Sequence, residues 1–124
     1  MMILGVGTDI IEIKRMKKAL ENERFKERVY TERERAYCES RGRQAAASYA
    51  ARFSGKEAVL KAFGTGLRQG SLQDIEILPD DLGCPRVELR GYYGSLAEEK
   101  GVKQVHVSLS HSVEYATAQC VMEG

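Results

Sequence analysis

The stretch RQAAASYAARFSGKEAVLKAFGTG, residues 43–66, decides the fold. Seven of these residues are alanine, the strongest helix former, and Phe53 follows Tyr49 at the helical spacing of four. Gly55 weakens the middle of the helix by about 1 kcal/mol relative to alanine. Gly64 and Gly66 supply stop signals. We therefore expect a long central helix over residues 43–63.

Shorter elements are predicted before this helix. The segment ILGVGTDII, residues 3–11, is β-branched and predicts a strand that ends near Asp9, with its glycines marking a bulge or a close backbone approach. Apolar residues four apart predict a helix over residues 14–21. A capping box at residues 31–34 opens a further short helix, which Gly42 is expected to end.

After the central helix, the apolar period changes from helical spacing to two. Alternation predicts four strands, at residues 75–77, 87–89, 105–109 and 115–122, with a short helix over residues 92–100 between the second and third. We expect an α+β fold in which a mostly antiparallel sheet packs on the long central helix.

The composition limits the class of protein. The 124 residues suit a single domain over residues 1–124, and the net charge of +1 excludes a globally basic nucleic-acid coat or an acidic tail. No apolar run approaches the roughly 18 residues of a membrane span, and the start shows no signal peptide. Three cysteines lie far apart without metal spacing, which predicts reduced thiols in a cytoplasmic protein.

The small net charge conceals an asymmetry along the chain. Residues 14–43 carry eleven Lys and Arg against six Glu, a net of +5, whereas the rest carries eight against twelve acidic residues, a net of −4. Such a segment is either a solvated helical surface of mixed charge or a docking site for an acidic partner or polyanion.

Two candidate site clusters involve carboxylates. Asp9 is either a turn or cap residue or a ligand for Mg²⁺, which takes one or two carboxylates together with water and phosphate oxygens. Glu57 and Lys61 lie four apart and share a helix face. They form either a surface ion pair or a carboxylate and an ammonium that hold a metal and a phosphate side by side.

The third cluster is HVSLSH, residues 106–111. Strand alternation places His106, Ser108 and Ser110 on one face and His111 on the other. The polar face is either exposed to solvent or donates hydrogen bonds to an anionic ligand. The chain has no GxSxG motif for a serine nucleophile, and the GTG at residues 64–66 lacks the frame of a P-loop.

These segments together resemble the holo-[acyl-carrier-protein] synthase group of 4′-phosphopantetheinyl transferases. The match consists of GVGTDI at residues 5–10, RFSGKEAVLKAFGTG at residues 52–66 and HVSLSH at residues 106–111, in this order and spacing. TERE at residues 31–34 and LQDIEI at residues 72–77 extend it over nearly the whole chain. The longer transferases of the superfamily contain two such units, and 124 residues hold one.

The resemblance implies a reaction and an assembly. The 4′-phosphopantetheine group of coenzyme A moves to a serine hydroxyl of apo acyl carrier protein, which releases adenosine 3′,5′-bisphosphate and supplies holo carrier for fatty acid biosynthesis. It also implies Mg²⁺ as cofactor and a homotrimer with active sites at the subunit interfaces. The physical requirement agrees, because attack at a pyrophosphate phosphorus depends on charge neutralisation and alignment.

The resemblance also assigns roles to residues. Asp9 and Glu57 match the metal ligands, and with Lys61, which contacts a phosphate as a point charge, they form the predicted catalytic set. The acceptor of the serine proton is either Glu57 or a metal-bound water. The residues implied to bind coenzyme A are Lys61, Gly64, Thr65, Gly66 and His106.

The basic segment gains a partner from the same resemblance, which implies that acyl carrier proteins are acidic and helical. Arg15 matches the position where the family docks the carrier, and Lys14, Lys18 and Arg24 extend the predicted surface. One departure concerns Ser54 and Gly55, which replace the small Ala residues of the family pattern and put the rigidity of the helix there in question.

Two other functions fit parts of the sequence. A metal-dependent phosphodiesterase acting on nucleotides would use the same Asp9 and Glu57, with water in place of the carrier serine. A non-catalytic module would bind RNA through the basic helix, but no aromatic RNP repeats are present. We therefore expect neither a nucleic-acid nor a membrane partner.

Overall fold

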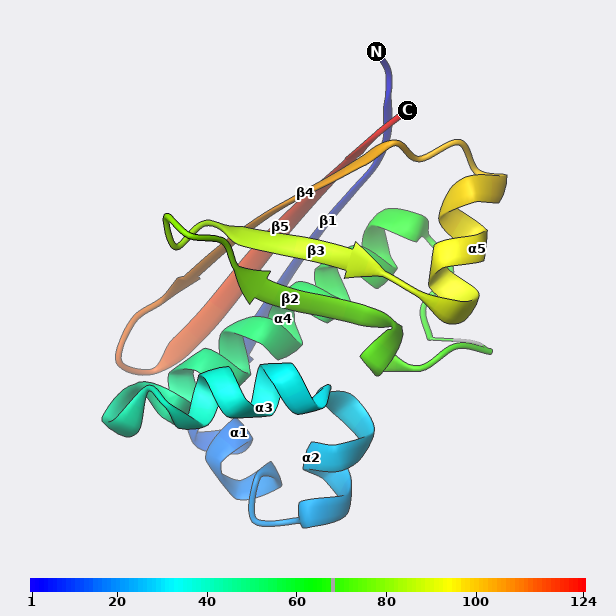
Figure 1. Ribbon diagram of the computed structural model, residues 1–124. Helices are drawn as coiled ribbons and strands as arrows, with labels where there is room; N and C mark the ends of the chain where they lie inside the picture. The colour runs from blue at the N-terminus through cyan, green and yellow to red at the C-terminus, as the bar shows by residue number, and fades with distance from the viewer. Residues whose placement is uncertain (68) are drawn as a thin grey trace.

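The computed structural model describes residues 1–67 and 69–124, with the long helix α4 (Ala45–Phe63) at its centre (Figure 1). Of the described helices, none is long and apolar enough to cross a bilayer. The other elements, in chain order, are β1 (Ile3–Glu12), α1 (Ile13–Ala19), α2 (Glu23–Val29), α3 (Glu32–Glu39), the 3₁₀ helices η1 (Gly42–Gln44) and η2 (Leu72–Asp74), β2 (Ile75–Pro79), β3 (Pro85–Leu89), α5 (Gly91–Glu99), β4 (Gln104–His111) and β5 (Tyr115–Glu123).

The strands form two antiparallel sheets. One has the order β1-β5-β4, and the other is the β2–β3 hairpin. In the larger sheet Asp9 pairs with Ala118, which pairs in turn with Leu109. Helix α4 lies across one face of this sheet, and α1, α2 and α3 gather around its N-terminal half (Figure 1). The predicted α+β fold with a mostly antiparallel sheet on a central helix is confirmed.

Strand β1 lies against α4 at backbone distance. A Cβ atom at Gly5 would overlap the carbonyl oxygen of Ala62, and one at Gly7 would overlap the carbonyl oxygen of Ala58. Only glycine allows a strand and a helix to approach so closely. The sequence predicted that the glycines of this strand mark either a β-bulge or a close backbone approach. The structure has both, because the β1–β5 register also shifts between Ile3 and Gly5.

The core consists of two clusters that share α4. Gly55, predicted to weaken the helix, leaves α4 unbroken and makes room for the sheets instead, because a Cβ there would lie 2.6 Å from the Ile77 side chain and 3.1 Å from Leu109. The cluster toward the hairpin and α5 includes Val59, Leu60, Phe63, Ile75, Ile77 and Tyr93. The cluster toward α1, α2 and α3 includes Met16, Val29, Tyr30, Cys38 and Tyr49.

Two predicted boundaries are wrong. The first strand does not end near Asp9 but continues to Glu12, because ladder pairing with β5 runs on as far as Tyr115. Asp9 is therefore an interior strand residue. The third helix ends at Glu39, with Ser40 as its cap, before Gly42. Gly42 instead adopts a φ of 60° at the start of η1.

The face of the larger sheet that points away from α4 exposes apolar side chains. Val6 is 55% exposed, Ile10 64% and Tyr115 44%. His106 and Ser108 of β4 are exposed on the same face, next to this apolar group. Exposed apolar patches on a folded chain mark interaction surfaces.

Candidate active site

The Asp9 carboxylate is the centre of the candidate site. Its side chain is 15% exposed and both oxygens are occupied by donors from α4. The Ser54 hydroxyl donates to Oδ2 at 3.1 Å, and the Lys61 ammonium donates to Oδ1 at 3.1 Å. Lys61 also donates to the backbone oxygen of Thr8 at 3.0 Å. The sequence did not identify Ser54 as a site residue, because an isolated serine in a helix carries no signal of its strand partner.

Glu57 shares this face of α4 and is half-buried. Burial raises the pKa of its carboxyl above the ordinary value and the negative charge of Asp9 raises it further, whereas Lys61 lowers it. None of the residues that the structure describes forms a hydrogen bond or ion pair with the Glu57 side chain. Of the two alternatives for Glu57 and Lys61, the surface ion pair between them does not form among the described residues, because Lys61 turns to the strand and pairs with Asp9.

Two neighbouring carboxylates from different elements suit a hard divalent cation. Over residues 1–67 and 69–124, no group of three or more His, Cys, Asp or Glu side chains is placed to enclose a metal. Mg²⁺ does not need such a group, because it usually binds one or two carboxylates and completes its octahedron with water and substrate phosphates. Glu57, which has no hydrogen-bond or ion-pair partner among residues 1–67 and 69–124 and whose pKa is raised by burial and by the charge of Asp9, fits that requirement.

Lys56, next to Glu57 in sequence, has a different role. Its ammonium is fully buried and donates to Glu34 at 2.7 Å, to the backbone oxygen of Leu72 at 2.9 Å and to that of Ile75 at 2.7 Å. Burial lowers the pKa of Lys56, and the charge of Glu34 opposes that shift. This buried pair joins α3, α4 and η2–β2. Because Lys56 points toward these elements, the next residue, Glu57, points in a different direction, toward Asp9.

A groove of about 290 Å³ leads from Asp9 to the basic helix α1. Arg15 is one of its lining residues, and Phe25 and Phe53 contribute apolar walls. The sequence analysis named Asp9 as a candidate metal ligand on a strand and Arg15 as a carrier-binding residue on a helix. In the structure both residues line this groove. An elongated substrate in this groove would contact both the carboxylate and the basic helix.

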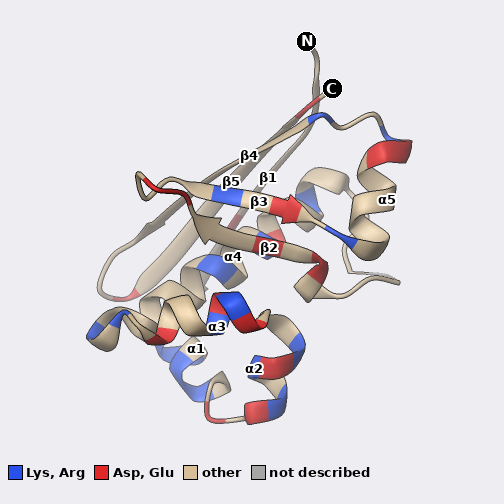
Figure 2. Ribbon diagram, in the orientation of Figure 1, with Lys and Arg blue, Asp and Glu red and all other residues tan. Residues whose placement is uncertain are grey.

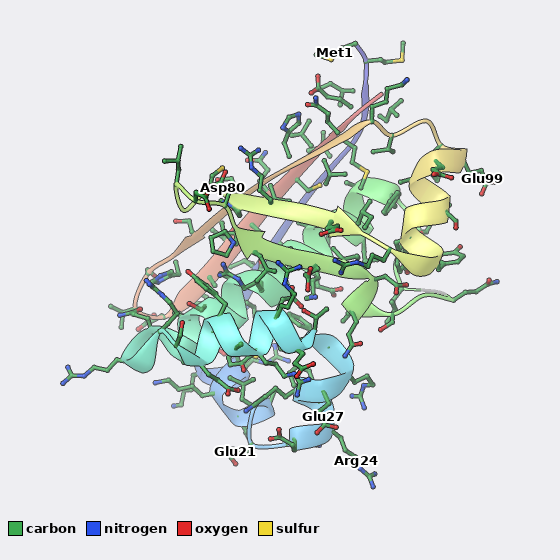
Figure 3. The ribbon with its side chains drawn as sticks, viewed as in Figure 1. Met1, Glu21, Arg24, Glu27, Asp80 and Glu99 are labelled. Carbon is green, nitrogen blue, oxygen red and sulfur yellow. The ribbon has the colours of Figure 1, made fainter. Side chains whose placement is uncertain are left out.

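The predicted carrier-binding residues are all exposed. Lys14, Arg15 and Lys18 lie on α1, and Arg24 lies on α2. Figure 2 shows the concentration of basic residues on α1, and Figure 3 shows Arg24 pointing away from the body of the molecule. They form a basic surface beside the groove.

The predicted coenzyme A residues Gly64, Thr65 and Gly66 lie directly after the C-terminus of α4. Gly64 caps the helix in the left-handed conformation, with φ 81°, and its N–H donates to the carbonyl of Leu60. Gly66 has φ 67°. The two glycines therefore reverse the chain shortly after Lys61, at the end of the helix.

His106 is not brought to the carboxylates within the chain. Its side chain is exposed on the sheet face away from α4, and its Nε2 lies 2.6 Å from Glu123 Oε1. Asp9 points to the α4 face of the same sheet. The two predicted site residues therefore lie on opposite faces of one sheet.

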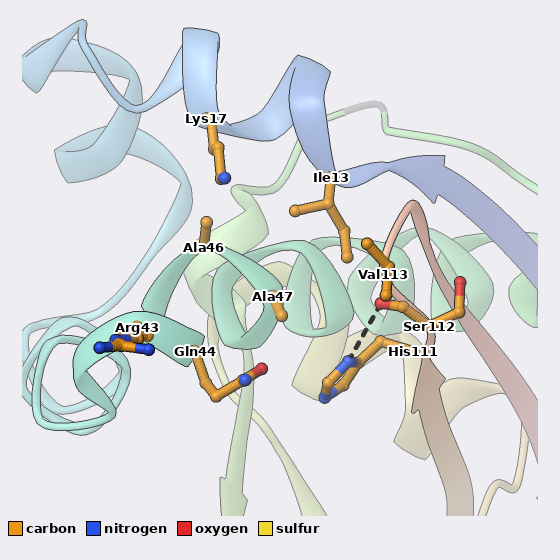
Figure 4. Close-up of a pocket in the computed structure, with 9 residues that line it drawn as sticks. All are labelled: Ile13, Lys17, Arg43, Gln44, Ala46, Ala47, His111, Ser112 and Val113. Atoms are coloured by element: carbon orange, nitrogen blue, oxygen red, sulfur yellow. Dashed lines mark hydrogen bonds between the residues drawn. The ribbon is translucent and has the colours of Figure 1, made fainter.

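A second cavity of about 390 Å³ lies between α1, the N-terminus of α4 and the β4–β5 turn (Figure 4). Lys17, Arg43 and His111 contribute to its wall, which places His111 on the other face of β4 from His106 as alternation predicts. No predicted catalytic residue lines this cavity.

Known sequences are similar to this chain over nearly its whole length. The model of the 4′-phosphopantetheinyl transferase superfamily matches residues 5–120. A holo-[acyl-carrier-protein] synthase of Fusobacterium nucleatum is 45% identical over 122 residues, which cover 98% of this chain and 99% of the relative. The synthase of Clostridium acetobutylicum is 49% identical over 123 residues and 98% of each chain.

Solved structures of the same kind share the fold. The holo-[acyl-carrier-protein] synthase of Neisseria meningitidis superposes with a TM-score of 0.90 at 34% identity, over 99% of this chain and 100% of its own. The synthase of Bacillus anthracis, solved in complex with coenzyme A (3′,5′-ADP), gives 0.83 at 40% identity, over 100% and 99%. With a family model, full-length relatives and the fold in agreement, this chain belongs to the 4′-phosphopantetheinyl transferase superfamily.

Proposed function

We propose that the chain is a holo-[acyl-carrier-protein] synthase that transfers 4′-phosphopantetheine from coenzyme A to a serine of apo acyl carrier protein. Its full-length relatives have this activity by name, and a related structure contains coenzyme A (3′,5′-ADP). The observation that carries the proposal is the pair of carboxylates Asp9 and Glu57, of which Asp9 lines the same groove as Arg15. Residues 1–124 act as one domain in this reaction.

The chemistry is a substitution at phosphorus. The carrier serine oxygen forms a bond to the phosphorus that bears pantetheine, the bond to the bridging oxygen breaks, and adenosine 3′,5′-bisphosphate leaves. Asp9 and Glu57 would hold Mg²⁺, which would supply charge neutralisation at the phosphoryl oxygens. Lys61 would place a positive charge on a phosphate oxygen. The serine proton would pass to Glu57 or to a water molecule at the site.

The coenzyme A site spans two chains of a homotrimer. Lys61, Gly64, Thr65 and Gly66 contact the coenzyme from the chain that supplies Asp9, and His106 contacts a phosphate from a neighbouring chain. Two features support this assignment: His106 lies on the face opposite Asp9, and that face exposes Val6, Ile10 and Tyr115 next to it. A ring of copies covers such a face and closes without leaving an edge.

The acidic carrier docks on the basic surface of α1 and α2. Arg15 is its principal contact, because it also lines the groove to Asp9. Lys14, Lys18 and Arg24 surround it and are exposed. Complementary charge of this kind raises the encounter rate and selects the partner.

The test is incubation with coenzyme A, Mg²⁺ and apo carrier, followed by mass spectrometry of the carrier. We expect the carrier to gain one phosphopantetheine and adenosine 3′,5′-bisphosphate to appear. Loss of coenzyme A without carrier would instead support a nucleotide phosphodiesterase and would reject the transferase. EDTA is expected to stop the transfer, and added Mg²⁺ to restore it.

A further inference from the structure

The two donors on the Asp9 carboxylate differ in character. Lys61 reaches Oδ1 from a side chain that is 56% exposed, and its charge competes with any cation for that oxygen. Ser54 reaches Oδ2 from a fully buried position and carries no charge. A bound cation would therefore displace Lys61 from Asp9 and leave the Ser54 hydroxyl in place.

The packing of β1 on α4 places Ser54 under Asp9. Gly5 meets Ala62 and Gly7 meets Ala58, so that two residues along the strand correspond to four residues along the helix. The next step of the same register brings Asp9 to Ser54. The position of the hydroxyl is therefore set by backbone contacts, not by a flexible side chain.

Among the residues that the structure describes, the Ser54 hydroxyl has one hydrogen-bond partner. Serine in a helix interior commonly returns its hydroxyl to the carbonyl four residues earlier. Within the described residues, the only hydrogen bond of Ser54 Oγ is the one to Asp9. The backbone of Asp9 is also held, because Thr117 Oγ1 donates to its carbonyl at 2.8 Å. With the backbone of Asp9 held in this way, its side chain can still rotate, and the hydrogen bond from Ser54 restricts that rotation.

We infer that Ser54 is a positioning residue for the metal site: it holds Asp9 Oδ2 and leaves Oδ1 to Mg²⁺ beside Glu57. The inference rests on the proposed function. Carboxylate ligands that are themselves hydrogen-bonded bind metals about 10- to 100-fold more tightly than those without such support. Because the family pattern has a small Ala residue here, we expect the hydroxyl to tune the affinity rather than create it.

The test measures Mg²⁺ binding directly. Calorimetric titration of the coenzyme A-bound protein is expected to show about tenfold weaker Mg²⁺ binding in Ser54→Ala. Ser54→Cys, which keeps the size but is a weak donor, is expected to bind with intermediate affinity. Ser48→Ala is the matched control, because Ser48 is buried in the same helix and its hydroxyl makes no hydrogen bond among the described residues.

The kinetics provide a second readout. The Ser54→Ala protein is expected to need more Mg²⁺ for half-maximal transfer and to regain the wild-type rate at saturating Mg²⁺, since Asp9 and Glu57 are intact. Unchanged Mg²⁺ affinity, an equal loss in Ser48→Ala, or a rate that Mg²⁺ does not restore would overturn the inference. If the wild-type protein itself neither binds Mg²⁺ nor transfers, the proposed function has failed instead.

Discussion

Gly7 of β1 lies against the carbonyl oxygen of Ala58 in α4, with no room for a methyl group between them. The repeat of this contact explains how the site is assembled. Two strand residues cover about 6.7 Å and four helical residues about 6 Å, so the two backbones stay in step from Gly5 to Asp9. Asp9 on the strand is thereby held beside Ser54 and Lys61 on the helix.

Gly7→Ala is expected to destabilise the fold by about 3 kcal/mol, the upper part of the range for overpacking, because backbone rather than a side chain must move. Urea unfolding followed by circular dichroism measures this change. Gly94→Ala in α5 is the control, because a Cβ there would lie 3.2 Å from the carbonyl oxygen of Leu89 and would not overlap it. An equal loss in both variants would contradict a special role for the β1–α4 contact.

Glu57→Gln is expected to abolish Mg²⁺-dependent transfer while raising the stability of the metal-free protein. The pKa of Glu57 is raised in the folded state. The ionised Glu57 carboxylate therefore lowers the free energy of unfolding. This loss develops as the pH rises from the pKa of the unfolded chain through the higher pKa of the folded protein. Thermal unfolding in EDTA between pH 4 and roughly 8 should show a decline in wild-type stability that is smaller in the variant.

The same variant is expected to lose stabilisation by Mg²⁺, since a ligand stabilises only the state that binds it. Addition of Mg²⁺ and coenzyme A should raise the wild-type melting temperature and leave that of Glu57→Gln close to its value with coenzyme A alone. Wild-type transfer by the variant would remove Glu57 from the metal site.

Lys56→Met is expected to cost about 3–5 kcal/mol, because it leaves the carboxylate of Glu34 buried without its partner. The double variant Lys56→Met/Glu34→Gln should cost less than the sum of the single changes. Arg86→Met provides a control at an exposed ion pair with Asp80, where solvent screening leaves only a small expected loss of stability. Additive effects of Lys56 and Glu34 in urea unfolding would argue against the coupled pair.

Arg15→Glu is expected to raise the Michaelis constant for the carrier roughly tenfold, which corresponds to about 1.4 kcal/mol, with a small effect on that for coenzyme A. The reason is the loss of complementary charge at the docking surface. Lys100→Glu makes the same charge change at the exposed end of α5, away from the groove, and should leave both constants near wild type. Equal increases for both substrates would contradict docking at α1.

Mixed oligomers test whether His106 acts on a neighbouring chain. Asp9→Ala and His106→Ala proteins are each expected to have little activity, and about a quarter of the sites in a random mixture should contain both native residues if adjacent copies share a site. A mixture of Asp9→Ala with Glu57→Gln should stay inactive, because those two residues belong to the same chain. Equal recovery in both mixtures, or a fully active monomer by light scattering, would refute the shared site.

Local pattern predicted most of the elements and singled out Asp9 and Glu57 as candidate site residues. Alanine content predicted α4, alternation predicted the strands, and the short motifs around Asp9 and Glu57 placed the chain in its superfamily. These signals are local because helix propensity, strand period and motif spacing each depend on residues close in sequence. The end of β1 was predicted wrongly because its last pairs are set by β5, more than a hundred residues away.

Only the tertiary structure decided which partners the charged and polar side chains of α4 take. Helical spacing left open whether Lys61 pairs with Glu57. In the structure Lys61 pairs with Asp9, and the Ser54 hydroxyl donates to the same carboxylate. Lys56 turns into the protein to meet Glu34. The physical reason is that these choices depend on the rotation of α4 about its axis, which is set by glycine contacts and core packing between segments far apart in the chain.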